Sequence, residues 1–324
     1  MITRRTIAAG LLAAPALSLP KLAGAQTFPS KPCRFVIPYP GGGIVDIAGR
    51  SIAEAMAADL GQPVIVDPRP GGNSIIGTEI VAKSPPDGHT WVLATLSHAV
   101  VGHLQPLPYD PLADFQGVAM IGVANAVALV PASLPVASLK ELVAYAKGNP
   151  GKVNYLNPGN GSSIHLSGEL LKVTAGIDMV GVPYRGLPPG IPDLLDGRLQ
   201  FAMLSVPLCI AHVRSGKLKA LAYYGEQRHA DLPEVPTMAE AGFADAEVKS
   251  WYTLAVPAKT RPSIVERIHV AATKALADPE ARKRLAAASI SVGKAMSPAE
   301  VQSMYRSESE RYGKLVKAAG IKGD

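Results

Sequence analysis

Strands, loops rich in glycine or proline, and helices alternate along most of this chain. The first unit is a buried strand over residues 34–38, a glycine turn over 40–43 and a helix over 45–60 with its apolar residues on one face. Further strands are predicted at 63–66, 90–94, 118–123, 126–130, 153–156, 179–182, 200–204 and 219–223. This alternation predicts an α/β fold in which mainly parallel sheets are flanked by helices.

Three capping boxes mark predicted helix starts, at Ser138–Glu141, Thr237–Glu240 and Ser297–Glu300. Helices are also predicted over residues 75–83 and from 163 to about 174. Roughly the last eighty residues are expected to be mainly helical.

The first 25 residues have the pattern of an export signal. Arg4 and Arg5 precede an apolar run over residues 7–19, and the small residues of Ala23–Ala25 form a cleavage site. The apolar run is shorter than the roughly 20 residues that span a bilayer. We predict that residues 1–25 are a signal peptide for the Sec or the twin-arginine route, and that no later segment crosses a membrane.

Length and charge narrow the classes of function. A chain of 324 residues exceeds one ordinary hydrophobic core, so two domains are expected. Removal of residues 1–25 deletes Arg4, Arg5 and Lys21 but no acidic residue, and the formal net charge falls from +6 to +3. No long run of like charges remains, and nucleic-acid binding is therefore not expected.

The chain has two cysteines, Cys33 and Cys209. An oxidising compartment would permit a disulfide, but the long separation of the two residues gives no sign that they meet. Two buried, unpaired thiols are the alternative that we favour.

Five polar loops follow predicted strands, at 39–46, 69–74, 95–98, 157–163 and 182–186. In α/β sheets, ligands bind on the loops at the carboxyl ends of the strands. The first loop places consecutive glycines before a helix, whose first turn has free N–H groups and the positive end of the helix dipole. Each loop alone is more typical of a plain connection, but together the five predict one composite pocket for an anion.

Motifs of common enzymes are missing. The sequence has no G-x-S-x-G nucleophile elbow, no complete dinucleotide fingerprint, no P-loop and no H-E-x-x-H zinc motif. We therefore predict no cofactor, no metal and no catalytic residue. His165 and Glu169 lie four positions apart on a predicted helix, so a metal or catalytic role is the alternative to a hydrogen bond that shapes the preceding loop.

Short motifs recur between about Phe28 and Gly320 in the order and spacing of one protein family. They are Pro38-Tyr-Pro-Gly-Gly-Gly-Ile-Val-Asp46, Gly61-Gln-Pro-Val64, Arg69-Pro-Gly71, Val81-Ala-Lys-Ser-Pro-Pro-Asp-Gly-His-Thr90, Leu107-Pro-Tyr-Asp110, Gly159-Asn-Gly-Ser162, Val182-Pro-Tyr-Arg-Gly186 and Leu232-Pro-Glu-Val-Pro-Thr237. With these motifs the chain resembles the Bug family, the substrate-binding receptors of tripartite tricarboxylate transporters.

The resemblance implies a two-lobed Venus-flytrap fold of the type II-like periplasmic binding proteins. Lobe 1 would comprise residues 26–125 and 250–324, and lobe 2 residues 126–249. The family implies a monomer in the periplasm that captures a small carboxylate and delivers it to membrane permease subunits. A sensor that passes lobe closure to a signalling partner is the alternative, and a small-molecule enzyme is a more remote one.

The resemblance also implies which residues contact the ligand, largely through backbone amides and bridging waters. From lobe 1 they would be Tyr39, Gly42, Gly43, Asp46, Asn73, Ser74 and Ser97. From lobe 2 they would be Asn157, Asn160, Gly161, Ser162 and Tyr184.

Several positions depart from the pattern of the family. Residues Ile44–Val45 replace a frequent Ser-Thr pair, Pro68 a frequent Asn, Asn157 a frequent Ser, and Leu204–Ser205 a frequent Asp-Asn. The loss of hydroxyl groups and a carboxylate suggests a less polar pocket. From Ile44, Val45 and Leu204 we hypothesise a preference for a monocarboxylate or an aromatic acid.

Overall fold

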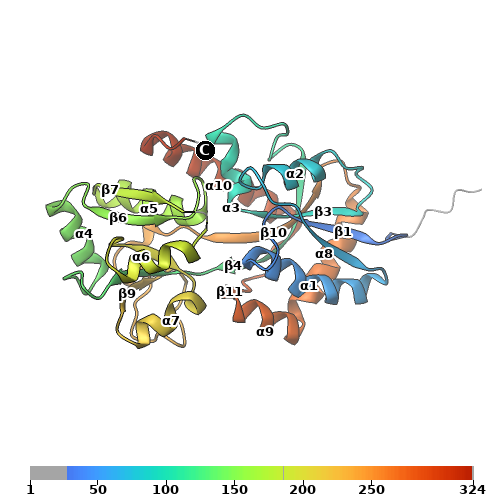
Figure 1. The fold of residues 1–324 in the computed structure, drawn as a ribbon. Helices are drawn as coiled ribbons and strands as arrows, with labels where there is room; N and C mark the ends of the chain where they lie inside the picture. The colour runs from blue at the N-terminus through green and yellow to red at the C-terminus, as the bar shows by residue number, and fades with distance from the viewer. Residues whose placement is uncertain (1–27, 185, 323–324) are drawn as a thin grey trace, which may run out of the picture.

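The computed structural model describes residues 28–184 and 186–322, which form two α/β lobes lying side by side (Figure 1). One lobe contains the blue beginning of the described chain, and the other contains the green and yellow middle part. The two-lobed α/β fold class is therefore confirmed. The predicted signal peptide lies outside the described residues.

Three sheets organise the described chain. A six-stranded sheet in lobe 1 has the order β11-β4-β10-β3-β1-β2, and lobe 2 contains a three-stranded sheet β8-β5-β9 and the pair β6-β7. The strands are β1 Cys33–Ile37, β2 Val64–Pro68, β3 Thr90–Thr95, β4 Phe115–Ala124, β5 Val127–Pro131, β6 Val153–Asn157, β7 Met179–Pro183, β8 Ala202–Leu204, β9 Leu218–Tyr223, β10 Ser250–Pro257 and β11 Ile290–Ser291.

The helices lie on the faces of these sheets. They are α1 Ile44–Leu60, α2 Ile75–Ala82, α3 Leu96–Leu104, α4 Leu139–Gly148, α5 Ser163–Ala175, α6 Ile191–Leu195, α7 Val206–Arg214, α8 Pro262–Ala277, α9 Pro279–Ala287 and α10 Pro298–Ala319. Short 3-10 turns are formed by Pro188–Gly190 and Ala244–Ala246. None of the helices in the described ranges is both long enough and apolar enough to span a bilayer.

The sheets are mixed, which corrects the expectation of mainly parallel ones. Strand β1 pairs in parallel with β2 and β3, but β10 runs antiparallel to both β3 and β4. The reason is the path of the chain, because β4 leads out of lobe 1 and β10 leads back into it. Two neighbouring strands that cross between the lobes in opposite directions must pair antiparallel.

Alternate side chains of the central strands enter two different cores of lobe 1. Phe35 and Ile37 pack with α1 and α8 on one face, whereas Val36 lies on the other face with α3 and α10. Both faces of the sheet are therefore covered, as the consecutive apolar residues Phe35–Ile37 of β1 require. All three side chains are fully buried.

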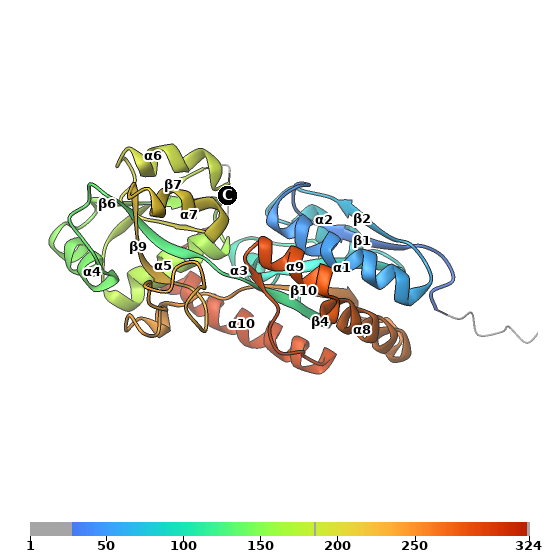
Figure 2. The same ribbon diagram turned by 90° about the horizontal axis from the view of Figure 1, so that it is seen from below.

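The last helix, α10, contacts both lobes. Tyr305 and Leu315 of α10 share an apolar cluster with Leu166 of α5. The Trp251 indole at the start of β10 donates to Glu308 of α10 at 3.1 Å. Figure 2 shows α10 extending from beneath lobe 1 to α5. Besides the two crossing strands, this helix forms a third link between the lobes.

Two of the predicted capping boxes differ in the structure. The capping box at Ser297 is complete and begins α10. Thr237 and Glu240 also bond each other's backbone amides through their side chains, but residues 237–242 form a turn and not the start of an α-helix.

The two cysteines are not paired. Cys33 and Cys209 are free and fully buried, each in the core of a different lobe.

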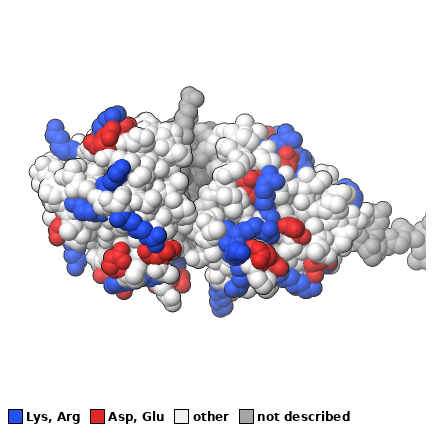
Figure 3. Space-filling view, turned by 60° about the horizontal axis from the view of Figure 1, so that its bottom comes forward, with Lys and Arg blue, Asp and Glu red and all other residues white. Residues whose placement is uncertain are grey.

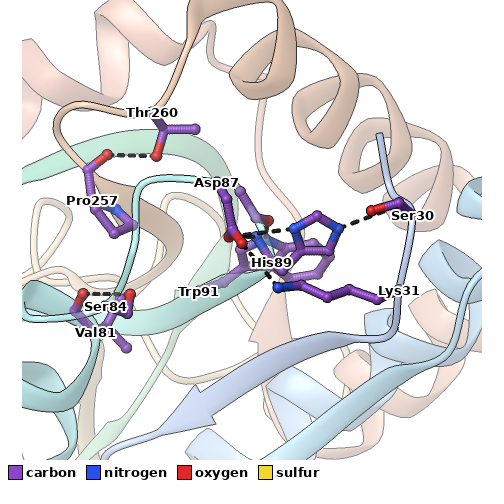
Figure 4. Close-up of polar contacts among 10 residues, drawn as sticks. Ser30, Lys31, Val81, Ser84, Asp87, His89, Trp91, Pro257 and Thr260 are labelled. Atoms are coloured by element: carbon purple, nitrogen blue, oxygen red, sulfur yellow. Dashed lines mark hydrogen bonds and ion pairs between the residues drawn. The ribbon is translucent and has the colours of Figure 1, made fainter. Parts of the chain in front are cut away.

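The Val81–Thr90 motif fastens the beginning of the described chain to lobe 1 (Figure 4). The Ser30 amide donates to the His89 ring at 3.3 Å, and the Lys31 ammonium pairs with Asp87 at 3.0 Å. The His89 amide also donates to Asp87 at 3.0 Å. The motif therefore has a structural role at the start of β1, where the strand enters the sheet.

Candidate functional site

The glycine loop before α1 is closed by a carboxylate of the helix that it precedes. One Asp46 oxygen, Oδ2, accepts the Gly42 amide at 2.9 Å and the Arg50 Nε at 2.8 Å. Gly42 has φ 79°, a left-handed conformation that favours glycine. No side chain caps α1 at Gly43, so the N–H groups of its first turn keep their donor capacity for a ligand.

Asp46 is 3% exposed, and its second oxygen, Oδ1, has no hydrogen-bond partner in the described residues. Burial raises the pKa of this carboxyl, but the hydrogen bonds from Arg50 and Gly42 and the Arg50 charge outweigh it and leave the pKa below its ordinary value. Asp46 is therefore ionised and holds the glycine loop in place.

We expect the free energy of unfolding of Asp46→Asn to depend less on pH in the acidic range than that of the wild type. A carboxyl whose pKa is lower in the folded chain stabilises the fold above its unfolded pKa, and this contribution is lost as the pH falls through the folded pKa. The free energy of unfolding in urea should therefore change less between about pH 7 and about pH 3 in the variant. Asp245→Asn, at an exposed residue, is the control, and equal changes in Asp46→Asn and wild type would refute this role.

A second helix start lies beside the glycine loop. The segment after β3 begins α3 at Leu96 and is not the loop that we predicted. Thr95 does not cap this helix with its side chain, because its hydroxyl instead pairs with the Tyr39 hydroxyl at 2.9 Å. Ser97 is buried in the first turn. The amides at the start of α3 therefore also lack a side-chain cap.

The loop before α2 is strained and reaches the other lobe. Asn73 and Ser74 have φ values of 50° and 78°, which is unusual for residues other than glycine and is common at functional sites. The side-chain amide of Asn73 donates to the backbone carbonyl of Asn160 at 2.8 Å. These two loops are 87 positions apart in sequence, and their contact joins the lobes.

The loop from Asn157 to Ser163 is organised by its own polar groups. Asn157 accepts the Gly159 amide at 3.0 Å and donates to the Asn160 side chain at 2.9 Å. Gly161 donates to Nδ1 of His165 at 3.1 Å. Ser162 caps α5 by accepting the His165 amide at 3.2 Å. The loop thus keeps one shape with its backbone facing Asn73.

The Tyr184 hydroxyl is already engaged within lobe 2. It donates to Asp193 at 2.5 Å, and Asp193 also pairs with Arg198 at 2.7 Å. Burial and the neighbouring Asp193 raise the pKa of Tyr184 to about 12. The Tyr184 amide donates to the Asn157 carbonyl at 2.8 Å. This residue therefore supports the Asn157 loop as well as bordering it.

The structure bears on two alternatives from the sequence. Val45 and Leu204 are buried in the cores of the two lobes, so the hypothesis of a less polar pocket retains only Ile44, which is half-buried. His165 holds the loop through Gly161, and Glu169 accepts the Tyr155 hydroxyl and the Lys172 ammonium at 2.8 and 2.9 Å. These contacts match the expected loop-shaping role, and the described ranges hold no cluster of metal ligands.

Sequence reasoning missed two residues at this site. Leu104, at the end of α3, lies where a Cβ on Gly161 would approach within 2.4 Å, so the lobes meet closely here. Thr95 aligns Tyr39 with the start of α3. Thr95 lies in the predicted 95–98 loop but was not singled out within it, because a threonine that ends a strand has no distinctive signal. The position of Leu104 depends on a helix that was not predicted.

Of the predicted residues, Asn73 contacts Asn160 across the two lobes, and Figure 3 shows that the surface is grooved between the lobes. The backbone N–H groups at uncapped helix starts and the amides of polar loops donate hydrogen bonds but do not act as acids. Such an arrangement can bind an anion at the positive ends of the helix dipoles. The residues named here offer no paired nucleophile and base for acyl or phosphoryl transfer.

Comparison with known proteins gives consistent matches over most of the chain. Residues 48–321 match the family described as "Tripartite tricarboxylate transporter family receptor". The UPF0065 protein in the tcbD-tcbE intergenic region of a Pseudomonas species is 36% identical over 317 residues, covering 97% of this chain and 94% of that protein. Protein BugT of Bordetella pertussis is 36% identical over 244 residues, covering 74% and 75% of the two chains.

Solved structures agree with these sequence matches. A protein of R. palustris with adipate has a TM-score of 0.78 and 31% identity, covering 92% of this chain and all of its own. MatC from Rhodopseudomonas palustris with bound malate has a TM-score of 0.76 and 29% identity, covering 89% of this chain and all of its own.

Proposed function

Because the chain belongs to the family of tripartite tricarboxylate transporter receptors, we propose that it captures a small carboxylate between its lobes and releases it unchanged. The observation that carries this proposal is the meeting of two donor-rich surfaces. The uncapped starts of α1 and α3 lie in lobe 1, and the Asn157–Ser163 loop of lobe 2 contacts the loop before α2 in lobe 1 through the hydrogen bond from Asn73 to Asn160. A carboxylate between these surfaces would accept hydrogen bonds from both.

We assign the ligand contacts to the residues predicted from the sequence. Those of lobe 1 are Tyr39, Gly42, Gly43, Asp46, Asn73, Ser74 and Ser97, and those of lobe 2 are Asn157, Asn160, Gly161, Ser162 and Tyr184. Asp46 acts by holding the glycine loop, because its Oδ2 is engaged by Gly42 and Arg50.

The two donor-rich surfaces lie on different lobes, so a ligand that contacts both of them favours closure of the lobes. We propose that lobe 1 comprises residues 26–125 and 250–324 and lobe 2 residues 126–249, with the passage between them at β4 and β10. A ligand that contacts both lobes stabilises the closed state by its differential affinity for that state. The closed receptor, a monomer in the periplasm, would then deliver the carboxylate to permease subunits. The similarity to proteins solved with adipate and malate supports this ligand class.

A thermal-shift screen of the mature protein tests the ligand class. Acetate, malate, adipate, citrate and benzoate represent mono-, di-, tri- and aromatic carboxylates. We expect at least one of them to raise the melting temperature, because a ligand at 100 times its Kd adds about 2.7 kcal/mol of stability. The corresponding alcohols or amides serve as uncharged controls and should have no effect. Unchanged melting temperatures with all five acids would refute carboxylate capture.

Recovery of the ligand tests whether the protein acts on it. After prolonged incubation of the best binder with stoichiometric protein, mass spectrometry should return the acid unchanged. Formation of a product at a rate that scales with protein concentration would contradict a purely binding role.

A further inference from the structure

A crevice of about 330 Å³ lies between the lobes, away from the loops assigned to the carboxylate. Lobe 2 contributes Tyr223 and His229 to its lining, and lobe 1 contributes Arg282 and Ala286 of α9 together with residues 289–292. None of these residues belongs to the predicted site. The volume is at the lower end of the range for small-molecule sites.

The crevice is built onto the strand that crosses between the lobes. Asn125, between β4 and β5, donates its amide to the Ser289 carbonyl at 3.1 Å and its side chain to the Ser291 hydroxyl at 2.7 Å. Ser289 is buried and has φ 58°, a conformation that only a well-determined environment maintains in a residue other than glycine. The lobe 1 wall of the crevice is therefore held in a fixed position against the crossing point.

Arg282 brings a positive charge that forms no ion pair with any carboxylate in the described part of the chain. Its Nε donates to the Leu276 carbonyl at 2.8 Å, and among the described residues Nη1 and Nη2 have no partner. Anchoring one nitrogen of a guanidinium leaves its remaining N–H groups as a fork that matches the geometry of an oxyanion.

Further donors complete the lining, and no acidic residue is part of it. Nδ1 of His229 accepts the Asp231 amide at 3.1 Å, so the neutral ring carries its proton on Nε2. The Asp231 carboxylate lies 3.9 Å from His229 Nδ1 through one oxygen, and its other oxygen is paired with Arg214 at 3.1 Å. The Ser291 hydroxyl accepts from Asn125 and keeps its own proton to donate.

We propose that this hinge crevice is a second binding site, separate from the carboxylate site, that takes a small oxyanion on the Arg282 guanidinium. This proposal goes beyond carboxylate capture. Because the walls come from both lobes, an anion here favours one angle between them. By linkage, its occupancy changes the affinity of the carboxylate site, and the carboxylate changes the affinity of the crevice by the same factor.

Inorganic phosphate is the probe, and α9 offers a matched control. Arg284 lies two positions from Arg282, but it pairs with Glu54 at 3.3 Å and does not line the crevice. Titration calorimetry of the mature protein with phosphate, at constant ionic strength, should detect binding in wild type and in Arg284→Met. Arg282→Met should weaken it about tenfold or more, as expected for lost hydrogen bonds between charged groups. Equal affinities in the two variants, or no binding in wild type, would overturn the proposal.

A further variant and a competition experiment locate the anion and separate this proposal from carboxylate capture. His229→Gln should weaken phosphate binding without removing the Arg282 anchor, and an unchanged affinity would count against the crevice. Phosphate should still bind, with a changed affinity, when the carboxylate site is saturated with the best acid. If that acid displaces phosphate competitively, the phosphate occupies the carboxylate site and the crevice is not a second site. Malonate in place of phosphate distinguishes a general oxyanion site from a phosphate-selective one, and binding of either is consistent with the proposal.

Discussion

Gly161→Leu should weaken binding of the best carboxylate by about 100-fold or more, equivalent to about 2.7 kcal/mol. Gly161 has φ 77°, and a Cβ there would lie 2.4 Å from Leu104 and 3.2 Å from the Asn73 amide nitrogen. A leucine must therefore displace the Leu104 side chain, and its own further atoms crowd the point where the two lobes meet. Fluorescence or calorimetric titration of the purified variant measures the loss.

Gly176→Leu is the matched control for this change. Gly176 ends α5 with φ 60°, and a Cβ there meets no atom within 4 Å. Both variants place leucine in a left-handed conformation, at a cost of roughly 1–2 kcal/mol, so their melting temperatures should fall similarly. Only Gly161→Leu should lose ligand affinity. Wild-type affinity in Gly161→Leu would show that the lobes need not approach each other here.

Gly77→Val should lower the free energy of unfolding by about 3 kcal/mol or more, the upper range for overpacking. A Cβ on Gly77 would lie 2.7 Å from the Arg69 carbonyl oxygen and 2.8 Å from Pro38 Cα. Both are backbone atoms, which cannot rotate away as a side chain can. The valine must move α2 and the Asn73 loop off the end of β1, and ligand affinity should fall as well.

Gly102→Val in α3 controls for the poorer helix propensity of valine. A Cβ at Gly102 meets only side-chain atoms at ordinary van der Waals distances, 3.5 Å from Leu107 and 3.7 Å from Pro111. Urea unfolding should therefore show a much smaller loss of stability than in Gly77→Val. Equal losses in the two variants would mean that the close approach of α2 to β1 is not required.

Local patterns in the sequence predicted the units of the fold well. The helix expected over 45–60 is α1, Ile44–Leu60, because its apolar period is regular and Gly61 adopts the left-handed conformation that ends it. Residues 95–98 were predicted to form a loop because polar residues follow a strand there, but they lie at the start of α3, Leu96–Leu104. Its His98 is in fact buried, with Nε2 bonded to the Pro111 carbonyl at 2.7 Å. That partner lies outside any local pattern.

The candidate site shows the same division between local and long-range information. The glycine loop and the Asn157–Ser163 loop were found because their composition is distinctive. Which side chains face the junction was not predictable, since Leu204 is buried in the lobe 2 core and the Tyr184 hydroxyl is engaged by Asp193. The contact of Asn73 with Asn160 depends on how the lobes pack, which no single segment encodes.

The packing of α10 against α5 limits how the lobes can move. Any rotation that keeps Leu166 in contact with α10 must have its axis near that helix. Displacement grows with distance from an axis, so a slight slide at α5 becomes a wide swing at α6 and α7, which lie farther from α10 (Figure 2). If the lobes close as proposed, the axis of that rotation lies near the C-terminal helix, and changes to its buried face should alter the range of the rotation without touching the ligand.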